Sequence, residues 1–306
     1  MDIRVSFGSE AKLGLRKIRT LAPTETIYLL TRGICHASCE FCSQAKNSES
    51  SVLSRVRWNV WELDKILPLL KGRERVCIQC LNFPGIFDDL MEMVKKIKSP
   101  LSVSAQPFTL EEMHDLSKYV DRISISLDCL TKDLFSKYKS YYDWDLHWTR
   151  LKRAVEIFGR DNVISHVIVG LGETEREAVN TMQELFDIGA MPSLFAFTPI
   201  KGTKLENRPQ PDLGTYRRLQ IARCLLSKGS IMPEEITYDG GKISSFGDVL
   251  GEVDTRAFQT WGCPHCNRPY FNEVPGKTIY NYPNDIDQAK LPELISEAQL
   301  KDNDKW

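Results

Sequence analysis

The sequence lacks any long uncharged apolar run. No segment offers the ~18 consecutive apolar residues needed to cross a bilayer, and the first twenty residues contain no continuous apolar stretch of the kind found in a signal peptide. An excess of charge of one sign is also missing, because 40 basic residues stand against 41 acidic ones and leave a formal net charge of -1. We therefore expect a cytoplasmic protein without nucleic acid or membrane among its partners.

Glycine and proline are not abundant, with 18 and 15 among 306 residues, which argues against a fibrous or low-complexity chain. Hydrophobic residues make up 42% and charged residues 26%, a composition typical of globular proteins. The length suits two domains or one large α/β barrel, so the chain can bury a sizeable core.

Cysteine is plentiful, and its distribution is the most informative feature of the sequence. The number, nine, is odd, which argues against a complete disulfide framework and favours metal or redox chemistry. We interpret Cys129 and Cys224 as buried small apolar residues. The other seven fall into three groups: Cys35, Cys39 and Cys42; Cys77 and Cys80; Cys263 and Cys266.

Short β-rich runs alternate with amphipathic stretches over most of the chain. The runs are 26–31, 75–79, 101–104, 122–127, 163–169 and 193–198; the amphipathic stretches are 60–70, 86–98, 109–119, 146–158, 173–188 and 213–228. Six β-then-α units predict an α/β fold, a partial or full parallel (β/α) barrel over residues 25–230. In such folds the chemistry lies at the carboxyl ends of the strands.

Two flanking regions differ from this pattern. Residues 1–24 form a basic leader, which we interpret as a solvated helix, or else as a surface for an acidic carrier domain or a partner subunit. Residues 231–306 form a turn-rich C-terminal extension that carries Cys263-Pro-His-Cys266 and is expected to end in a helix over 291–300.

A Cys-x3-Cys-x2-Cys motif, Cys35 to Cys42, directly follows the first predicted strand. Three thiolates so close together suit one iron-sulfur cluster and leave one iron without a protein ligand. Zinc is the alternative, but a structural zinc site usually needs four ligands, and only His36 is near enough to be the fourth.

This motif, with an aromatic residue, Phe41, before its third cysteine, resembles the signature of the radical S-adenosylmethionine (SAM) enzymes. The resemblance covers roughly residues 25–230 and implies a 4Fe–4S cluster that chelates SAM and cleaves it to a 5'-deoxyadenosyl radical. It also implies a barrel of the radical SAM type, whose interior shields the radical from water.

Further segments carry the resemblance. The segment 167–174 is similar to the family's fifth-strand motif, which implies that Ile168 packs on adenine and that Glu173 belongs to the SAM site; an ordinary strand followed by a helix start is the alternative. Ser126 and Asp128 follow the fourth strand, where biotin-synthase-like members contact the SAM ribose, although Asp128 also suits a helix N-cap. The usual Gly-Gly-Glu after the second strand is replaced by 79–82, Gln-Cys-Leu-Asn.

Alternation along the fifth strand places His166 and Ile164 on the same face as Ile168. We therefore interpret His166 as a candidate catalytic residue inside the barrel, with a hydrogen-bonded structural role as the alternative.

A second metal site is predicted from the remaining cysteines. Cys77 corresponds to an auxiliary-cluster ligand of biotin synthase, but the other ligands do not carry over, since Ile164 stands at one of those positions. The extension could fold back over the barrel mouth, so that Cys77, Cys263 and Cys266 hold an auxiliary 4Fe–4S cluster. Cys80 has the opposite parity and is a possible ligand only if the strand ends or bulges. A half zinc knuckle is the alternative for Cys263 and Cys266.

As a set, segments 28–31, 35–45, 75–79, 194–199 and 262–270 most closely resemble a subunit of the two-component lipoyl synthases. The resemblance implies sulfur insertion into an octanoyl group on a lipoyl-carrier protein, with a second radical SAM subunit and an electron donor such as ferredoxin as partners. Two alternatives stay open: a sulfur-free radical mutase or lyase, as in methylornithine synthesis or hydrogenase maturation, and a non-catalytic iron-sulfur partner protein.

Overall fold

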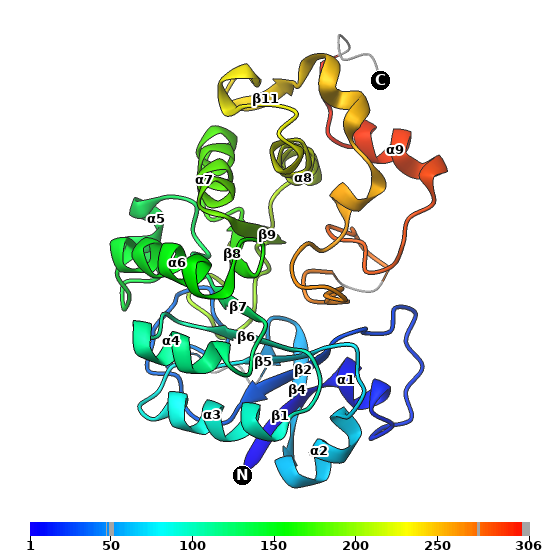
Figure 1. Cartoon of the computed structure of the whole chain (residues 1–306). Helices are drawn as coiled ribbons and strands as arrows, with labels where there is room; N and C mark the ends of the chain where they lie inside the picture. The colour runs from blue at the N-terminus through cyan, green and yellow to red at the C-terminus, as the bar shows by residue number, and fades with distance from the viewer. Residues whose placement is uncertain (47, 49–51, 274–275, 302–306) are drawn as a thin grey trace.

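The centre of the computed structural model, which describes residues 1–46, 48, 52–273 and 276–301, is a curled sheet. Six parallel strands lie side by side in chain order: β2 (Ile27–Thr31), β5 (Val76–Gln79), β6 (Leu101–Ala105), β7 (Arg122–Ile125), β8 (Val163–Val169) and β9 (Ala190–Ala196). In the described part of the chain β9 pairs only with β8, so the sheet is an open half-barrel (Figure 1). This confirms the predicted parallel barrel in its partial form.

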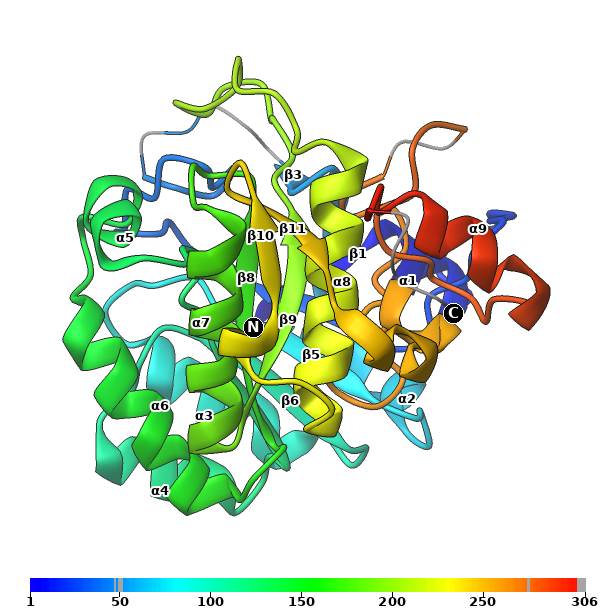
Figure 2. The same ribbon diagram turned by 90° about the horizontal axis from the view of Figure 1, so that it is seen from above.

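Helices cover the outer face of this sheet (Figure 2). They are α2 (Leu63–Leu70), α3 (Ile86–Lys96), α4 (Leu110–Ser117), α5 (Lys132–Tyr138), α6 (Trp144–Phe158), α7 (Glu175–Ile188) and α8 (Leu213–Lys228). Their first turns are fixed by capping, because a Thr or Asp side chain accepts a backbone N–H at the start of five of them: Thr109, Thr131, Asp143, Thr174 and Asp212.

The core lies between these helices and the sheet. In β8, Val163, Val167 and Val169 belong to this core, whereas His166 and Ile168 face the interior of the half-barrel. The alternation of a strand thus separates residues that hold the fold together from residues that line the site.

The basic leader departs from the prediction of a solvated helix. Asp2–Ser6 form strand β1, which pairs antiparallel with β2 and with β4 (Val56–Glu62); the short β3 (Val52–Leu53) adds to β4. Only the short α1 (Phe7–Lys12) is helical. The reason is hydrophobic burial. Ile3 and Val5 are fully buried, so extending the sheet stabilises the segment more than exposing these side chains to water would.

The C-terminal extension winds through short elements along α8. These are η1 (Pro233–Glu235), β10 (Thr237–Asp239), β11 (Lys242–Ser245), η2 (Gly247–Glu252), η3 (Thr255–Phe258), η4 (Gln288–Lys290) and α9 (Leu291–Ser296). The final helix is shorter than the predicted 291–300. Arg218 anchors the region, because its buried guanidinium pairs with Glu175 and donates to the carbonyl of Ala298 at 2.7 Å.

No helix in the described ranges has the length and apolar composition that crossing a membrane requires. The two ends of the chain lie far apart in Figure 1, but the loop of the extension between η3 and η4 contacts the segment that precedes β2, through Asn267 with Glu25 and Pro23.

Candidate active site

The Cys-x3-Cys-x2-Cys loop lies at the carboxyl ends of the parallel strands, directly after β2. Cys35, Cys39 and Cys42 line one wall of a cavity of about 250 Å³, which we call the central cavity. The loop is held by backbone hydrogen bonds to its surroundings, from His36 N to the Asn82 carbonyl at 2.7 Å and from Glu40 N to the Tyr138 carbonyl at 2.9 Å. The three thiols are therefore brought together by the fold as well as by their spacing.

The surroundings of these thiols suit a metal cluster. Burial raises the pKa of the Cys42 thiol to about 11, although an N–H from Gln44, 3.4 Å from its sulfur, opposes the shift. Burial also raises the pKa of Cys39, against the nearby charge of Lys139. Thiolates here need the charge of bound iron, which deprotonates its sulfur ligands. In the described residues no three metal-ligating side chains converge on a single ion position.

The same cavity is lined by other residues predicted for the SAM site, from the cysteine loop, the end of β7 and β8. Phe41, Ile168, Ser126 and His166 all line the central cavity, so alternation along β8 placed its two members correctly. The Nδ1 atom of His166 lies 3.0 Å from Ser126 Oγ, and its Nε2 lies 3.5 Å from an Arg268 nitrogen.

The protonation state of His166 follows from these contacts. Arg268 can only donate, so Nε2 accepts and the ring proton resides on Nδ1, which donates to Ser126 Oγ. Burial, followed by the charges of Arg268 and Lys139, lowers the pKa of His166 well below its ordinary value. His166 is thus a neutral, hydrogen-bonded residue in the cavity wall.

Asp128 also lines the cavity, and a residue that the sequence did not single out holds it there. Lys139 is fully buried, donates to the Ser126 carbonyl at 2.7 Å, and pairs with Asp128 at 3.0 Å. The N-cap of α5 is Thr131 rather than Asp128. Because lysine is usually exposed, nothing in the local sequence marks Lys139 as the residue that orients both polar groups.

Glu173 lies outside the cavity lining. Its carboxylate accepts the backbone N–H groups of Gly170 at 2.6 Å, and of Leu171 and Gly172 at 3.0 Å each. Both glycines have positive φ, 106° and 126°, which side chains rarely adopt. Glu173 therefore fixes the loop after β8, while the N-cap of α7 is Thr174.

The structure also brings Cys77, Cys263 and Cys266 together. They line one small pocket of about 20 Å³, which we call the cysteine pocket, inside the N-terminal half of the barrel. Burial raises the pKa of the Cys77 thiol to about 12, and burial followed by Cys266 raises that of Cys263, which hydrogen-bonds to Ser102. The Tyr28 hydroxyl lies 3.6 Å from the Cys266 sulfur.

The extension reaches this pocket from the opposite end of the barrel to the expected mouth. The resemblance to biotin synthase implied that Cys77 faces the interior, as it does, but the depth of Cys77 along the barrel depends on where β5 begins. Because Cys77 is the second residue of β5, it lies near the amino ends of the strands, and Cys263 and Cys266 meet it there.

Cys80 lies apart from this group. It follows β5, lines the central cavity and a neighbouring pocket, and is absent from the lining of the cysteine pocket. Cys129 and Cys224 are fully buried, as interpreted from the sequence.

Arg268 separates the two cysteine groups, and the sequence analysis missed it. Its guanidinium lines both the central cavity and the cysteine pocket and lies 5.3 to 5.5 Å from the ring centres of Tyr28, Phe195 and Phe271. Burial opposes its charge, but the neighbouring thiols of Cys266 and Cys77 outweigh burial and raise its pKa. The only sequence signal was its position two residues after Cys266.

Comparison with curated proteins finds biotin synthases. The chain is 25% identical to the biotin synthase of Carboxydothermus hydrogenoformans over 280 residues, which is 85% of this chain and 79% of that protein. It is 21% identical to the biotin synthase of Methanococcus vannielii over 250 residues, or 76% and 72% of the two chains. No protein-family model matches the chain.

Solved structures show the same fold. Methylornithine synthase superposes with a TM-score of 0.54 and 14% identity over 72% of this chain and 65% of that one. The FeFe-hydrogenase maturase HydG superposes with a TM-score of 0.53 and 17% identity over 65% of this chain and 48%, about half, of its own. These likenesses show the fold, a half-barrel shared with methylornithine synthase and HydG, while the similarity in sequence is to biotin synthases.

Proposed function

We propose that this chain is a cytoplasmic radical SAM enzyme that inserts sulfur, and that it is one subunit of a two-component lipoyl synthase. It converts protein-bound octanoyl-lysine to lipoyl-lysine and consumes an auxiliary cluster as the sulfur source. In this proposal Cys35, Cys39 and Cys42 hold the 4Fe–4S cluster that binds SAM, and Cys77, Cys263 and Cys266 hold the auxiliary 4Fe–4S cluster.

The observation that carries the proposal is that the central cavity and the cysteine pocket share part of their lining. Ser104, His166 and Arg268 line both the central cavity and the cysteine pocket, so only one layer of side chains separates them. Sulfur insertion needs this neighbourhood, because a carbon radical generated in the central cavity must meet a sulfide before it reacts otherwise.

The chain's own residues prepare the cavity for this chemistry. When bound, SAM and its cluster would supply a 5'-deoxyadenosyl radical after one-electron reduction by the electron donor. The apolar side chains of Phe41, Ile168 and Phe271 exclude water from the wall where the radical would react, and they suit the alkyl chain of an octanoyl group. Asp128 and Ser126, held by Lys139, present polar atoms to the same space.

A metal count tests the proposal. After anaerobic reconstitution we expect about eight irons per chain, falling to about four in a Cys263→Ala, Cys266→Ala double variant. The matched control is Cys224→Ala, which removes a buried thiol in α8 far along the chain from either group and is expected to keep all the iron. About four irons in every variant would remove the sulfur source and favour the sulfur-free rearrangement.

A second measurement separates the two clusters by role. Cys77→Ala should leave reductive SAM cleavage intact and abolish thiolation of an octanoylated lipoyl-carrier protein, assayed with the second radical SAM subunit and reduced ferredoxin. Loss of both activities together would contradict the division of roles. Absence of SAM cleavage in the wild type would favour a non-catalytic iron-sulfur partner instead.

A further inference from the structure

Behind the cysteine pocket the molecule has a second opening, which we call the rear cleft. It measures about 820 Å³ and lies at the amino ends of the strands, as shown by its lining residues Arg122, the first of β7, and Met191 in β9. Cys263 and Cys266 line both the rear cleft and the cysteine pocket, whereas the central cavity lies at the other end of the barrel. The same two cysteines therefore face the interior and the outside.

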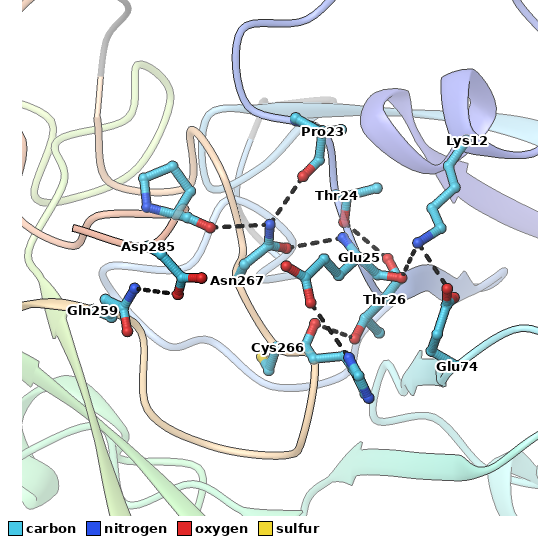
Figure 3. Close-up of polar contacts among 12 residues, drawn as sticks. Lys12, Pro23, Thr24, Glu25, Thr26, Glu74, Gln259, Cys266, Asn267 and Asp285 are labelled. Carbon is cyan, nitrogen blue, oxygen red and sulfur yellow. Dashed lines mark hydrogen bonds and ion pairs between the residues drawn. The ribbon is translucent and has the colours of Figure 1, made fainter. Parts of the chain in front are cut away.

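The segment that carries them, residues 262–266, forms the wall between pocket and cleft. Pro264 and His265 at its turn are exposed. Its edges are fastened on both sides, by Ser193 to the Trp261 carbonyl and by Thr26 Oγ1 to the His265 carbonyl at 2.7 Å. Figure 3 shows the second fastening beside Cys266 and Asn267.

The next residue in the chain, Asn267, anchors the C-terminal end of this wall. Its side chain accepts from Glu25 N at 3.1 Å and donates to the carbonyls of Pro23 at 2.9 Å and Pro283 at 3.2 Å (Figure 3). The wall is thus anchored at its base, while its turn projects into the rear cleft. An outward movement of the turn would open the contact of Thr26 with the His265 carbonyl and that of the His265 ring with Glu25, 3.3 Å away, and would separate Cys266 from Tyr28 and Cys263 from Ser102.

Such a movement is required because the cysteine pocket is smaller than an iron-sulfur cluster. The cysteine pocket, about 20 Å³, holds about one water molecule. A four-iron cluster is larger, so Cys263 and Cys266 must move away from Cys77 to hold it. Arg268 and the β-strands close the other sides, and the rear cleft is the side with free space.

We propose that the auxiliary cluster enters and leaves through the rear cleft, by displacement of the 262–266 wall, independently of what occupies the central cavity. The inference rests on the proposed function, because it requires an auxiliary cluster. Loading is a ligand exchange with a thiolate-bearing cluster donor: iron-sulfur bonds to the donor break as bonds to this chain's thiolates form. Protons pass from the incoming thiols to the released donor thiolates, and no electrons are transferred.

This arrangement has a functional consequence for an enzyme whose sulfur source is consumed. The substrate and SAM enter at the carboxyl ends of the strands, and the cluster donor approaches the opposite end. Product, SAM fragments and a carrier protein then need not leave before the sulfur source is renewed.

The first test measures iron release to a water-soluble iron chelator from the holoenzyme, with and without SAM. The Cys263→Ala, Cys266→Ala variant, which holds only the SAM cluster, supplies the reference trace, and Mössbauer spectra identify the cluster that remains. We expect SAM to slow release from the SAM cluster and leave release from the auxiliary cluster unchanged. Equal protection of both clusters would overturn the inference, because it would place both behind the same opening.

The second test narrows each opening in turn. Arg256 is exposed at the edge of the rear cleft, and Lys201 is exposed in the loop at the opposite end. Arg256→Trp should slow both loading and release of the auxiliary cluster several-fold, while Lys201→Trp should leave both rates unchanged. The opposite pattern, or equal rates, would overturn the inference.

Asn284→Trp, at another exposed point of the rear cleft, provides a second variant if Arg256→Trp fails to fold. SAM cleavage by each variant shows that the fold and the SAM site are intact. If the wild type binds only about four irons, the proposed function fails together with the inference. If two clusters are present and SAM protects both, the inference alone fails.

Discussion

The buried ion pair beside the central cavity gives a prediction whose size can be worked out. The Lys139 side chain is 0% exposed and that of Asp128 is 17% exposed, with 3.0 Å between Nζ and Oδ2. Lys139→Met keeps the length of the side chain but leaves the carboxylate without its partner and the Ser126 carbonyl without a donor. Breaking a buried pair by removing one member costs about 3–5 kcal/mol. We expect a loss of this order in the free energy of unfolding.

The second half of the prediction is the coupling between the two residues. Asp128→Asn removes the carboxylate charge that Lys139 neutralises, so the double variant should be more stable than the sum of the single losses implies. Residues in direct contact show coupling energies of about 0.5–3 kcal/mol, and a buried pair belongs at the upper end.

Urea unfolding of the metal-free, reduced protein, followed by tryptophan fluorescence, measures these quantities in a double-mutant cycle. The control is Lys152→Met on the exposed face of α6, where a surface change should stay within about 0.5 kcal/mol. A cost below about 1 kcal/mol for Lys139→Met, or single losses that simply add, would refute the assignment of Lys139 as the residue that holds Asp128.

Two further predictions concern the fifth strand and its loop. The pKa of His166 is lowered in the folded chain, so the unfolded chain binds more protons than the folded chain as pH falls below about 6.5. The free energy of unfolding should therefore decrease by up to about 1.4 kcal/mol per pH unit below that pH. His166→Gln should flatten this slope in urea titrations of the metal-free protein, whereas the exposed control His114→Gln should not. An unchanged slope would contradict the neutral state of His166. Glu173→Gln leaves at least one of the three N–H groups without an acceptor and the others with an uncharged one. We expect a loss of about 1.5–3 kcal/mol in the free energy of unfolding and weaker SAM binding by equilibrium dialysis, with exposed Glu184→Gln as the control. Equal stability of the Glu173 and Glu184 variants would show that the loop does not depend on the carboxylate.

Much of the fold was predictable because its signals are local. Alternation of β-rich runs with apolar residues at helical spacing placed the strands and helices of the half-barrel to within a few residues, and α8 at the predicted ends. The misses are non-local. Val60, predicted to begin a helix, pairs with Arg4 in the sheet, and β1 itself is stabilised by strands that come much later in the chain. A five-residue strand with distant partners leaves little trace in its own sequence.

The candidate site shows the same limit. Alternation correctly placed His166 on the same inward face as Ile168, because facing is a local property of a strand, whereas the inward positions of Ile168 and Cys77 were implied by the resemblance. The depth of a residue along the barrel depends on the whole sheet and not on the local sequence. The extension was therefore expected to meet Cys77 at the barrel mouth, whereas it does so near the amino ends of the strands. Buried charges such as Lys139 and Arg268 were missed, because only their partners in the folded chain make burial of a cation tolerable.

The contact between Thr26 and His265 also says something about the order of events during folding. These residues are 239 positions apart in the chain, whereas the three cysteines of the first motif span a single short loop. Closing a long loop has a larger entropic cost than closing a short one, and non-local contacts generally form late. The first motif can therefore form early from its own short loop, but the second cysteine group exists only after the segment that carries Cys263 and Cys266 has folded back onto β5. Of the two metal sites proposed, one is a property of a short segment and the other of contacts between distant parts of the chain.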